Sequence, residues 1–173
     1  MSAMYTVGTS ILYGRTGVCK IESIGAPSFQ KHDGRQYYKL LPVFSTSGEL
    51  IYVPLDMAAS IRPLISSGAA LEYLRRFPEL DPPVFHGKRP GELAAHYHEM
   101  LSPCSPEGCL LLIKEVYCKQ QNLAVQNKKP SEVDSRYLKI AERLVCEEFA
   151  AVLHTAPSAI KERLYAEIDR QTA

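Results

Sequence analysis

Five histidines and five cysteines are the residues of this chain whose types suit a metal site or a nucleophile. His96 and His98 are two residues apart in a segment expected to be helical, so they point about 200° apart and do not share a ligand site. Cys104, Cys109 and Cys118 are separated by four and eight residues, without a C-x-x-C pair. Buried thiols and surface histidines explain this set better than zinc, so we expect no metal and no cofactor.

Phosphate-binding loops and activated nucleophiles are not indicated either. The sequence contains neither G-x-x-x-x-G-K-[ST] nor G-x-G-x-x-G. Gly14-Arg15-Thr16-Gly17 is interpreted as a hairpin turn, because glycine supplies positive φ. We therefore expect a protein that is not an enzyme. An enzyme or metal-dependent sensor built on the cysteines and histidines is kept as a third alternative.

A row of basic residues is the clearest electrostatic feature. The stretch from Lys114 to Arg143 contains seven Lys/Arg against four Asp/Glu. Within it Arg136, Lys139 and Arg143 are spaced by three and four residues, so they share one helical face. Such a row binds the phosphate backbone of nucleic acids, although a solvated helix face is the commoner reason for it.

A second candidate surface lies in the N-terminal part. Tyr37, Tyr38 and Tyr52 are either an interface patch or half-buried strand residues. The run Ile51-Tyr52-Val53 is a candidate edge strand, and an unpaired edge accepts a strand from a partner protein. Composition leaves open whether it is an edge.

The elements that position these residues differ between the two halves of the chain. Residues 7–13, 17–24, 37–41 and 50–53 are predicted strands, each closed by Gly or Pro. Their short connections exclude parallel pairing and predict a small antiparallel barrel or sheet. Helices are predicted over 67–77, from Pro90 to Leu101, and after Ser105, Ser131 and Pro157. Ser131 and Asp134 form a variant capping box.

The domain organisation follows from this change of pattern. Residues 77–83 hold three prolines and are predicted to be a stiff linker. The predicted fold class is α+β: a small antiparallel β domain over 1–60, a connecting helix and Pro-rich linker over 61–83, and an all-α helical bundle over 84–173.

Composition excludes several classes of protein. The chain of 173 residues is 46% hydrophobic and 23% charged, which excludes disordered, collagen-like and coiled-coil proteins. Its net charge of +1 does not indicate a globally basic nucleic-acid binder. No apolar run approaches the roughly 20 residues that span a bilayer. The odd number of cysteines and the absence of signal-peptide features predict reduced thiols in the cytoplasm.

Short motifs along the chain occur in the order and at the spacing of a known family. They are Val7-Gly8, Ile11-Leu12-Tyr13, Gly17-Val18, Tyr38-Lys39-Leu40, Ile51-Tyr52-Val53-Pro54, Ile61-Arg62 and, downstream, Ser131, Arg136, Leu138, Ala141 and Glu148. In these motifs the chain resembles the CarD/CdnL family of bacterial transcription regulators, whose N-terminal module is shared with the transcription-repair coupling factor.

The resemblance implies a Tudor-like β-barrel that binds the β subunit of RNA polymerase partly by strand pairing. It also implies a helical bundle that touches promoter DNA next to the melted region. We accordingly assign polymerase binding to Ile51, Tyr52, Val53, Pro54 and Tyr38. We expect a monomer or a domain-swapped dimer.

The chain departs from the family at the DNA contact. Better-known members insert a Trp into the minor groove, but this chain has no Trp, and the corresponding position falls near Arg89-Pro90. Lys88 and Arg89, with Arg136, Lys139 and Arg143, are our candidates for non-specific DNA contact instead. The alternative is a polymerase- or protein-binding module of the same fold that no longer contacts DNA.

Overall fold

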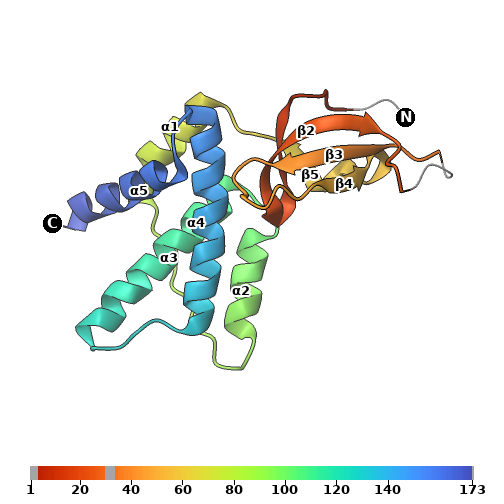
Figure 1. Cartoon of the computed structure of the whole chain (residues 1–173). Helices are drawn as coiled ribbons and strands as arrows, with labels where there is room; N and C mark the ends of the chain where they lie inside the picture. Colours follow the sequence, from red (N-terminus) through yellow and green to blue (C-terminus); the bar gives the residue numbers. More distant parts are fainter. Residues whose placement is uncertain (1–3, 30–33, 173) are drawn as a thin grey trace. The chain divides into compact units, whose positions relative to one another are not determined.

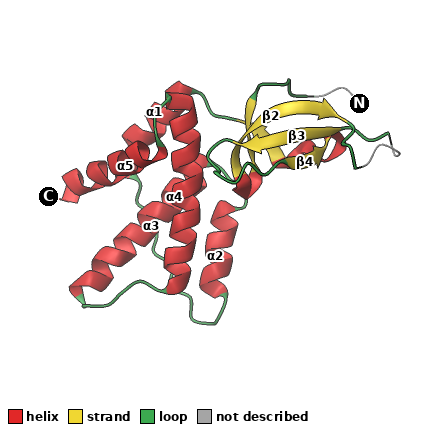
Figure 2. Ribbon diagram, viewed as in Figure 1, coloured by secondary structure: helices red, strands yellow, loops and turns green. Residues whose placement is uncertain are grey.

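The computed structural model describes residues 4–29 and 34–172 and contains two compact units, residues 1–65 and 66–173. The first unit consists mainly of strands and the second of helices (Figures 1 and 2), which confirms the α+β class. The boundary lies between residues 65 and 66. It differs from the predicted divisions at residues 60 and 83, because residues just after 60 still pair within the sheet.

Five strands of the described residues form one antiparallel sheet in the first unit. They are β1 (Ser10–Tyr13), β2 (Gly17–Gly25), β3 (Tyr37–Pro42), β4 (Ile51–Pro54) and β5 (Ile61–Pro63). Their order is β4-β3-β2-β1-β5, so each of the first four pairs with its neighbour in sequence, as short connections require. The sequence pattern allowed four or five strands but did not locate the fifth, because three residues are too few to display a period of two.

Local turns and side-chain alternation explain this sheet. Gly14 and Gly17, which flank the turn between β1 and β2, have φ values of 46° and 95°, as the hairpin interpretation requires. The core is apolar: Ile11, Ile21 and Leu40 are fully buried. Each buried side chain of this size contributes about 1.5–3 kcal/mol relative to exposure.

Five α-helices make up most of the second unit. They are α1 (Ser67–Arg76), α2 (Glu92–Leu101), α3 (Pro106–Val125), α4 (Glu132–Leu153) and α5 (Pro157–Thr172). α4 packs against all four others, and its buried face includes Ala141, Val145 and Phe149, as their spacing predicted. Among the described residues, no helix is both long enough and apolar enough to cross a membrane.

The helix starts follow their capping residues. The Ser105 hydroxyl accepts from the Gly108 amide, and Ser131 and Asp134 exchange both bonds of a capping box. α2 differs from the prediction, because Pro90 precedes the helix and Gly91, with a φ of 86°, occupies its N-cap position.

The proline-rich stretch that was predicted to be a linker belongs to the helical unit. Phe77 is fully buried and Pro78 is buried beside it in a 3-10 turn, Phe77–Glu79. The Lys114 ammonium group of α3 donates to the Pro78 carbonyl oxygen over 2.9 Å. The prolines therefore fix a turn against the bundle, and residues 64–66 connect β5 to α1.

Removing the cap of α4 tests this account of its start. We expect Ser131→Ala to lower the free energy of unfolding of the helical unit by about 1 kcal/mol, because the Asp134 amide loses its acceptor. Urea denaturation followed by circular dichroism measures the change. Ser158→Ala, an exposed serine in the first turn of α5, is the matched control and should change little. Equal midpoints for both variants would contradict the cap.

Candidate functional site

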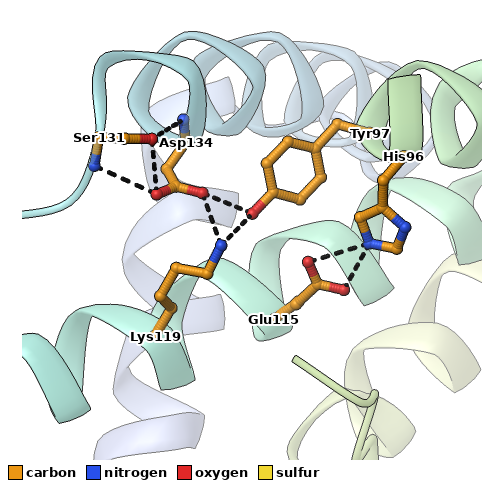
Figure 3. Close-up of polar contacts among 6 residues, drawn as sticks. All are labelled: His96, Tyr97, Glu115, Lys119, Ser131 and Asp134. Atoms are coloured by element: carbon orange, nitrogen blue, oxygen red, sulfur yellow. Dashed lines mark hydrogen bonds and ion pairs between the residues drawn. The ribbon is translucent and has the colours of Figure 1, made fainter. Parts of the chain in front are cut away.

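A buried polar network joins three helices of the second unit (Figure 3). The Lys119 ammonium group of α3 lies 3.0 Å from Asp134 Oδ1 of α4, and both side chains are at most 5% exposed. The Tyr97 hydroxyl of α2 donates to the same oxygen over 2.6 Å. Asp134 Oδ2 accepts from the amide and hydroxyl of Ser131 at 3.1 and 2.8 Å. Each buried side-chain nitrogen or oxygen of the described residues has a partner.

Opposing effects set the ionisation of this network. Burial raises the pKa of Asp134, but hydrogen bonds from Tyr97, Lys119 and Ser131 outweigh it and hold that pKa below its usual value. Burial and the Asp134 carboxylate raise the pKa of the Tyr97 phenol, which therefore stays a donor. The network is thus a charged, fully paired clamp between α2, α3 and α4.

The two histidines of α2 diverge, as their spacing predicted. His96 Nε2 lies 2.9 Å from the buried Glu115 carboxylate, and its ring stacks on Phe85 at a centroid distance of 4.5 Å. His98 is exposed. Burial raises the pKa of the Cys146 thiol to about 12, which makes it a poor nucleophile at neutral pH. Residues 4–29 and 34–172 contain no group of three or more potential metal ligands.

The predicted basic row lies on one exposed face of α4. Arg136, Lys139 and Arg143 are all exposed, and the Arg136 guanidinium group lies 5.3 Å from the centroid of the Tyr137 ring. Arg143 lies 3.4 Å from Glu147, so part of its charge is compensated. Lys139 and Arg143 line a nearby hollow.

That hollow is lined in part by a basic residue that the sequence pattern did not single out. It has a volume of about 250 Å³ and is lined by residues of α4 and the start of α5. Lys161 of α5 borders it together with Lys139 and Arg143, and donates to Glu142 over 3.0 Å. Only the packing of α5 on α4 reveals this cluster.

Lys88 and Arg89 are exposed and precede α2. Their backbone amides are held by a side chain of that helix, Glu92. The structure thus gives the two candidate basic residues a defined local backbone.

In the sheet unit, β4 lies at one end of the described strand order. The Leu55 amide donates to the Gln36 carbonyl oxygen over 3.0 Å, and alternate residues of an antiparallel strand face the same neighbour. Ile51 and Val53 therefore bond to β3, whereas Tyr52 directs its N–H and C=O groups away from β3. Composition left open whether 51–53 is an edge strand, and the strand order of the described residues shows that it is.

The side chains of the predicted polymerase-binding residues separate into two groups. Val53 and Tyr38 are 3% and 1% exposed, and the Tyr38 hydroxyl accepts from the amides of Met4 and Tyr5. Tyr38 is thus a core residue, which corrects the prediction of a surface contact there. The side chains of Ile51 and Pro54 are partly exposed.

Tyr52 has an aromatic neighbour that the sequence pattern missed. The Phe29 ring, in a residue 63% exposed, meets the Tyr52 ring edge-to-face at a centroid distance of 5.1 Å. A hollow of about 280 Å³ is lined by Tyr52, Tyr37, Lys39 and residues 23–28. Phe29 follows a strand without belonging to one, so periodicity gave no signal for it.

Comparison with protein families gives this unit an identity. Residues 5–65 match the CarD-like/TRCF RID domain. The N-terminal unit is a RID domain. The match ends at the boundary of the first compact unit, residue 65, and confirms the resemblance for that unit. The RID domain is an RNA polymerase-interacting module of the CarD/TRCF family. A search of curated proteins found no match to the chain.

The outward edge of β4 is therefore the edge of a RID domain. It offers main-chain groups at Tyr52, and the Phe29 and Tyr52 rings lie next to them. Main-chain groups at an edge strand add another strand whatever its sequence, and neighbouring side chains select it.

Acid should weaken the helical unit through Asp134. Its pKa is lower in the folded chain than the value of about 3.9 in an unfolded one, so its stabilisation is complete above that value and is lost as pH falls below about 4 through the folded pKa. We expect Asp134→Asn to remove this part of the pH dependence in urea denaturation. NMR titration of the wild-type carboxyl carbon gives a second readout. A pKa at or above 3.9 would contradict the prediction.

Proposed function

We propose that this chain is a bacterial transcription regulator without enzymatic activity. It binds the β subunit of RNA polymerase through its RID domain and contacts promoter DNA non-specifically through its helical unit. The observation that carries the proposal is the outward main-chain edge of β4 at Tyr52, in a unit that matches the RID domain.

The polymerase contact rests on strand addition. A partner strand placed against β4 would satisfy the outward N–H and C=O groups of Tyr52, as an added strand does at any open sheet edge. The Phe29 and Tyr52 rings supply apolar area beside it. The resemblance to the CarD/CdnL family implies a basic residue before Val-Pro in this strand of some members, whereas Tyr52 stands there in this chain. Main-chain pairing does not need that basic side chain.

The DNA contact rests on exposed cations. Lys88 and Arg89 before α2 and Arg136 and Lys139 on α4 present positive charge to solvent. Because this chain has no Trp, no indole is present to enter the minor groove, so phosphate contacts carry the affinity. Such binding is independent of base sequence and weakens steeply as salt rises.

One specific observation favours the alternative of a module that no longer contacts DNA. Glu147 lies 3.4 Å from Arg143, and Glu142 lies 3.0 Å from Lys161. These carboxylates reduce the positive field around the hollow between α4 and α5. The two functions differ in whether the basic residues of α4 affect promoter activity.

A backbone-specific substitution tests the polymerase contact. We expect Tyr52→Pro to abolish retention of RNA polymerase in a pull-down, because proline removes the outward N–H group and leaves the N–H groups of Ile51 and Val53 that face β3. Tyr52→Ala, the matched control, keeps the amide and should retain binding at reduced affinity. Equal binding of the proline variant and wild type would place the contact elsewhere.

The α4 row tests the DNA contact. Replacing Arg136, Lys139 and Arg143 together by Ala should weaken binding to duplex DNA at low salt. It should also reduce the slope of log affinity against log salt by about 0.9 for each phosphate that the variant no longer neutralises. Fluorescence anisotropy at several salt concentrations measures both quantities. Wild-type promoter activity in the triple variant would instead support a module that does not use DNA.

A further inference from the structure

The two basic residues before α2 lie in a loop that the first residue of α2 closes. Glu92 Oε2 accepts hydrogen bonds from the backbone amides of Lys88 and Arg89 at 2.8 and 3.2 Å. In return the Glu92 amide donates to the Arg89 carbonyl oxygen over 3.2 Å. A single carboxylate oxygen therefore holds two consecutive amides, while both basic side chains remain exposed.

The conformation of this loop favours glycine at two positions, Gly87 and Gly91. Gly91 has a φ of 86°, in the left-handed region that favours glycine. A Cβ atom on Gly87 would lie 3.0 Å from the Leu93 amide nitrogen, which is closer than side chains ordinarily approach. The backbone of the 87–92 loop is thus constrained at both ends. Gly87 packs closely against the start of α2, and Gly91 makes the turn into that helix.

The loop lies at the end of the helical unit to which the loop into α4 also leads (Figure 1). Figure 1 shows that the chain enters α2 and α4 at the same end, and the bond from Tyr97, in the middle of α2, to Asp134, in the first turn of α4, joins the two helices. The loop into α4 contains Lys128 and Lys129, both exposed. Glu132, also exposed, is one of two acidic residues in the first turn of α4, and the other, Asp134, is buried.

We propose that Glu92 is a positioning residue for the DNA contact. Its carboxylate holds the 87–92 loop so that Lys88 and Arg89 together meet the phosphodiester backbone. This inference rests on the proposed DNA contact and deepens it. A carboxylate near DNA weakens binding by charge repulsion alone, whereas one that pre-organises two cations strengthens binding by lowering the cost of ordering them. The sign of the effect therefore distinguishes the two roles.

The test compares three variants of the full chain in binding to a short duplex of mixed sequence. Glu92→Ala should weaken binding several-fold and lower the salt slope by up to about 1.8, the value expected when two phosphates are no longer neutralised. Glu92→Gln keeps a carbonyl oxygen that accepts from both amides, so it should restore wild-type affinity or exceed it. Glu132→Ala, the matched control, removes an acidic residue outside the loop and should bind as tightly as wild type or more tightly.

A second measurement follows the loop directly. Hydrogen exchange of the Lys88 and Arg89 amides, followed by NMR, should accelerate in Glu92→Ala while the amides in the middle of α2 keep their protection. Equal or tighter DNA binding by Glu92→Ala, or unchanged exchange of these two amides, would overturn the positioning role. If wild type itself fails to bind DNA at low salt, the proposed DNA contact falls and the positioning role falls with it.

Discussion

The carboxylate of Asp134 satisfies the polar groups of three helices at once. One oxygen accepts from the Lys119 ammonium group and the Tyr97 hydroxyl, and the other closes the cap at Ser131. An ammonium group buried without a partner is strongly unfavourable, so Lys119 can occupy the core only with this carboxylate beside it. The start of α4, the middle of α3 and the middle of α2 are therefore fixed to one another. Because the network fixes α2, it also limits where the segment that precedes α2 can lie.

The two units offer different kinds of interaction. The RID domain presents main-chain groups at the edge of β4, with the Phe29 and Tyr52 rings beside them. Hydrogen bonds of this kind depend little on salt. The helical unit presents ammonium and guanidinium groups, whose attraction to phosphate is strongly screened. In the proposed function the edge of β4, whose hydrogen bonds resist salt, would hold the polymerase. The basic groups of the helical unit would add affinity for nearby DNA, and this part would weaken as salt rises.

Acidic residues accompany several of the exposed cations in the helical unit. Glu147 and Glu142 lie beside Arg143 and Lys161, while Glu92 bonds to the backbone rather than to a basic side chain. A carboxylate paired with a basic side chain reduces the positive potential that this side chain presents to solvent. A carboxylate that accepts from backbone amides does not pair with the nearby basic side chains, which can still contact phosphate. This difference explains how a chain with a net charge of only +1 can still present local positive surfaces.

Sequence alone determined the features that depend on neighbours along the chain. The glycine turn before β2, the caps at Ser105 and Ser131 and the apolar row of α4 are set by bonds and spacings within a few residues. Tertiary structure decided the rest: the burial of Tyr38, the pairing of β5 with β1 and the packing of Phe77 into the bundle. A period shows which face of an element is apolar, but not which distant element covers it. For the same reason, the cations gathered around the hollow between α4 and α5 emerge only when the helices pack.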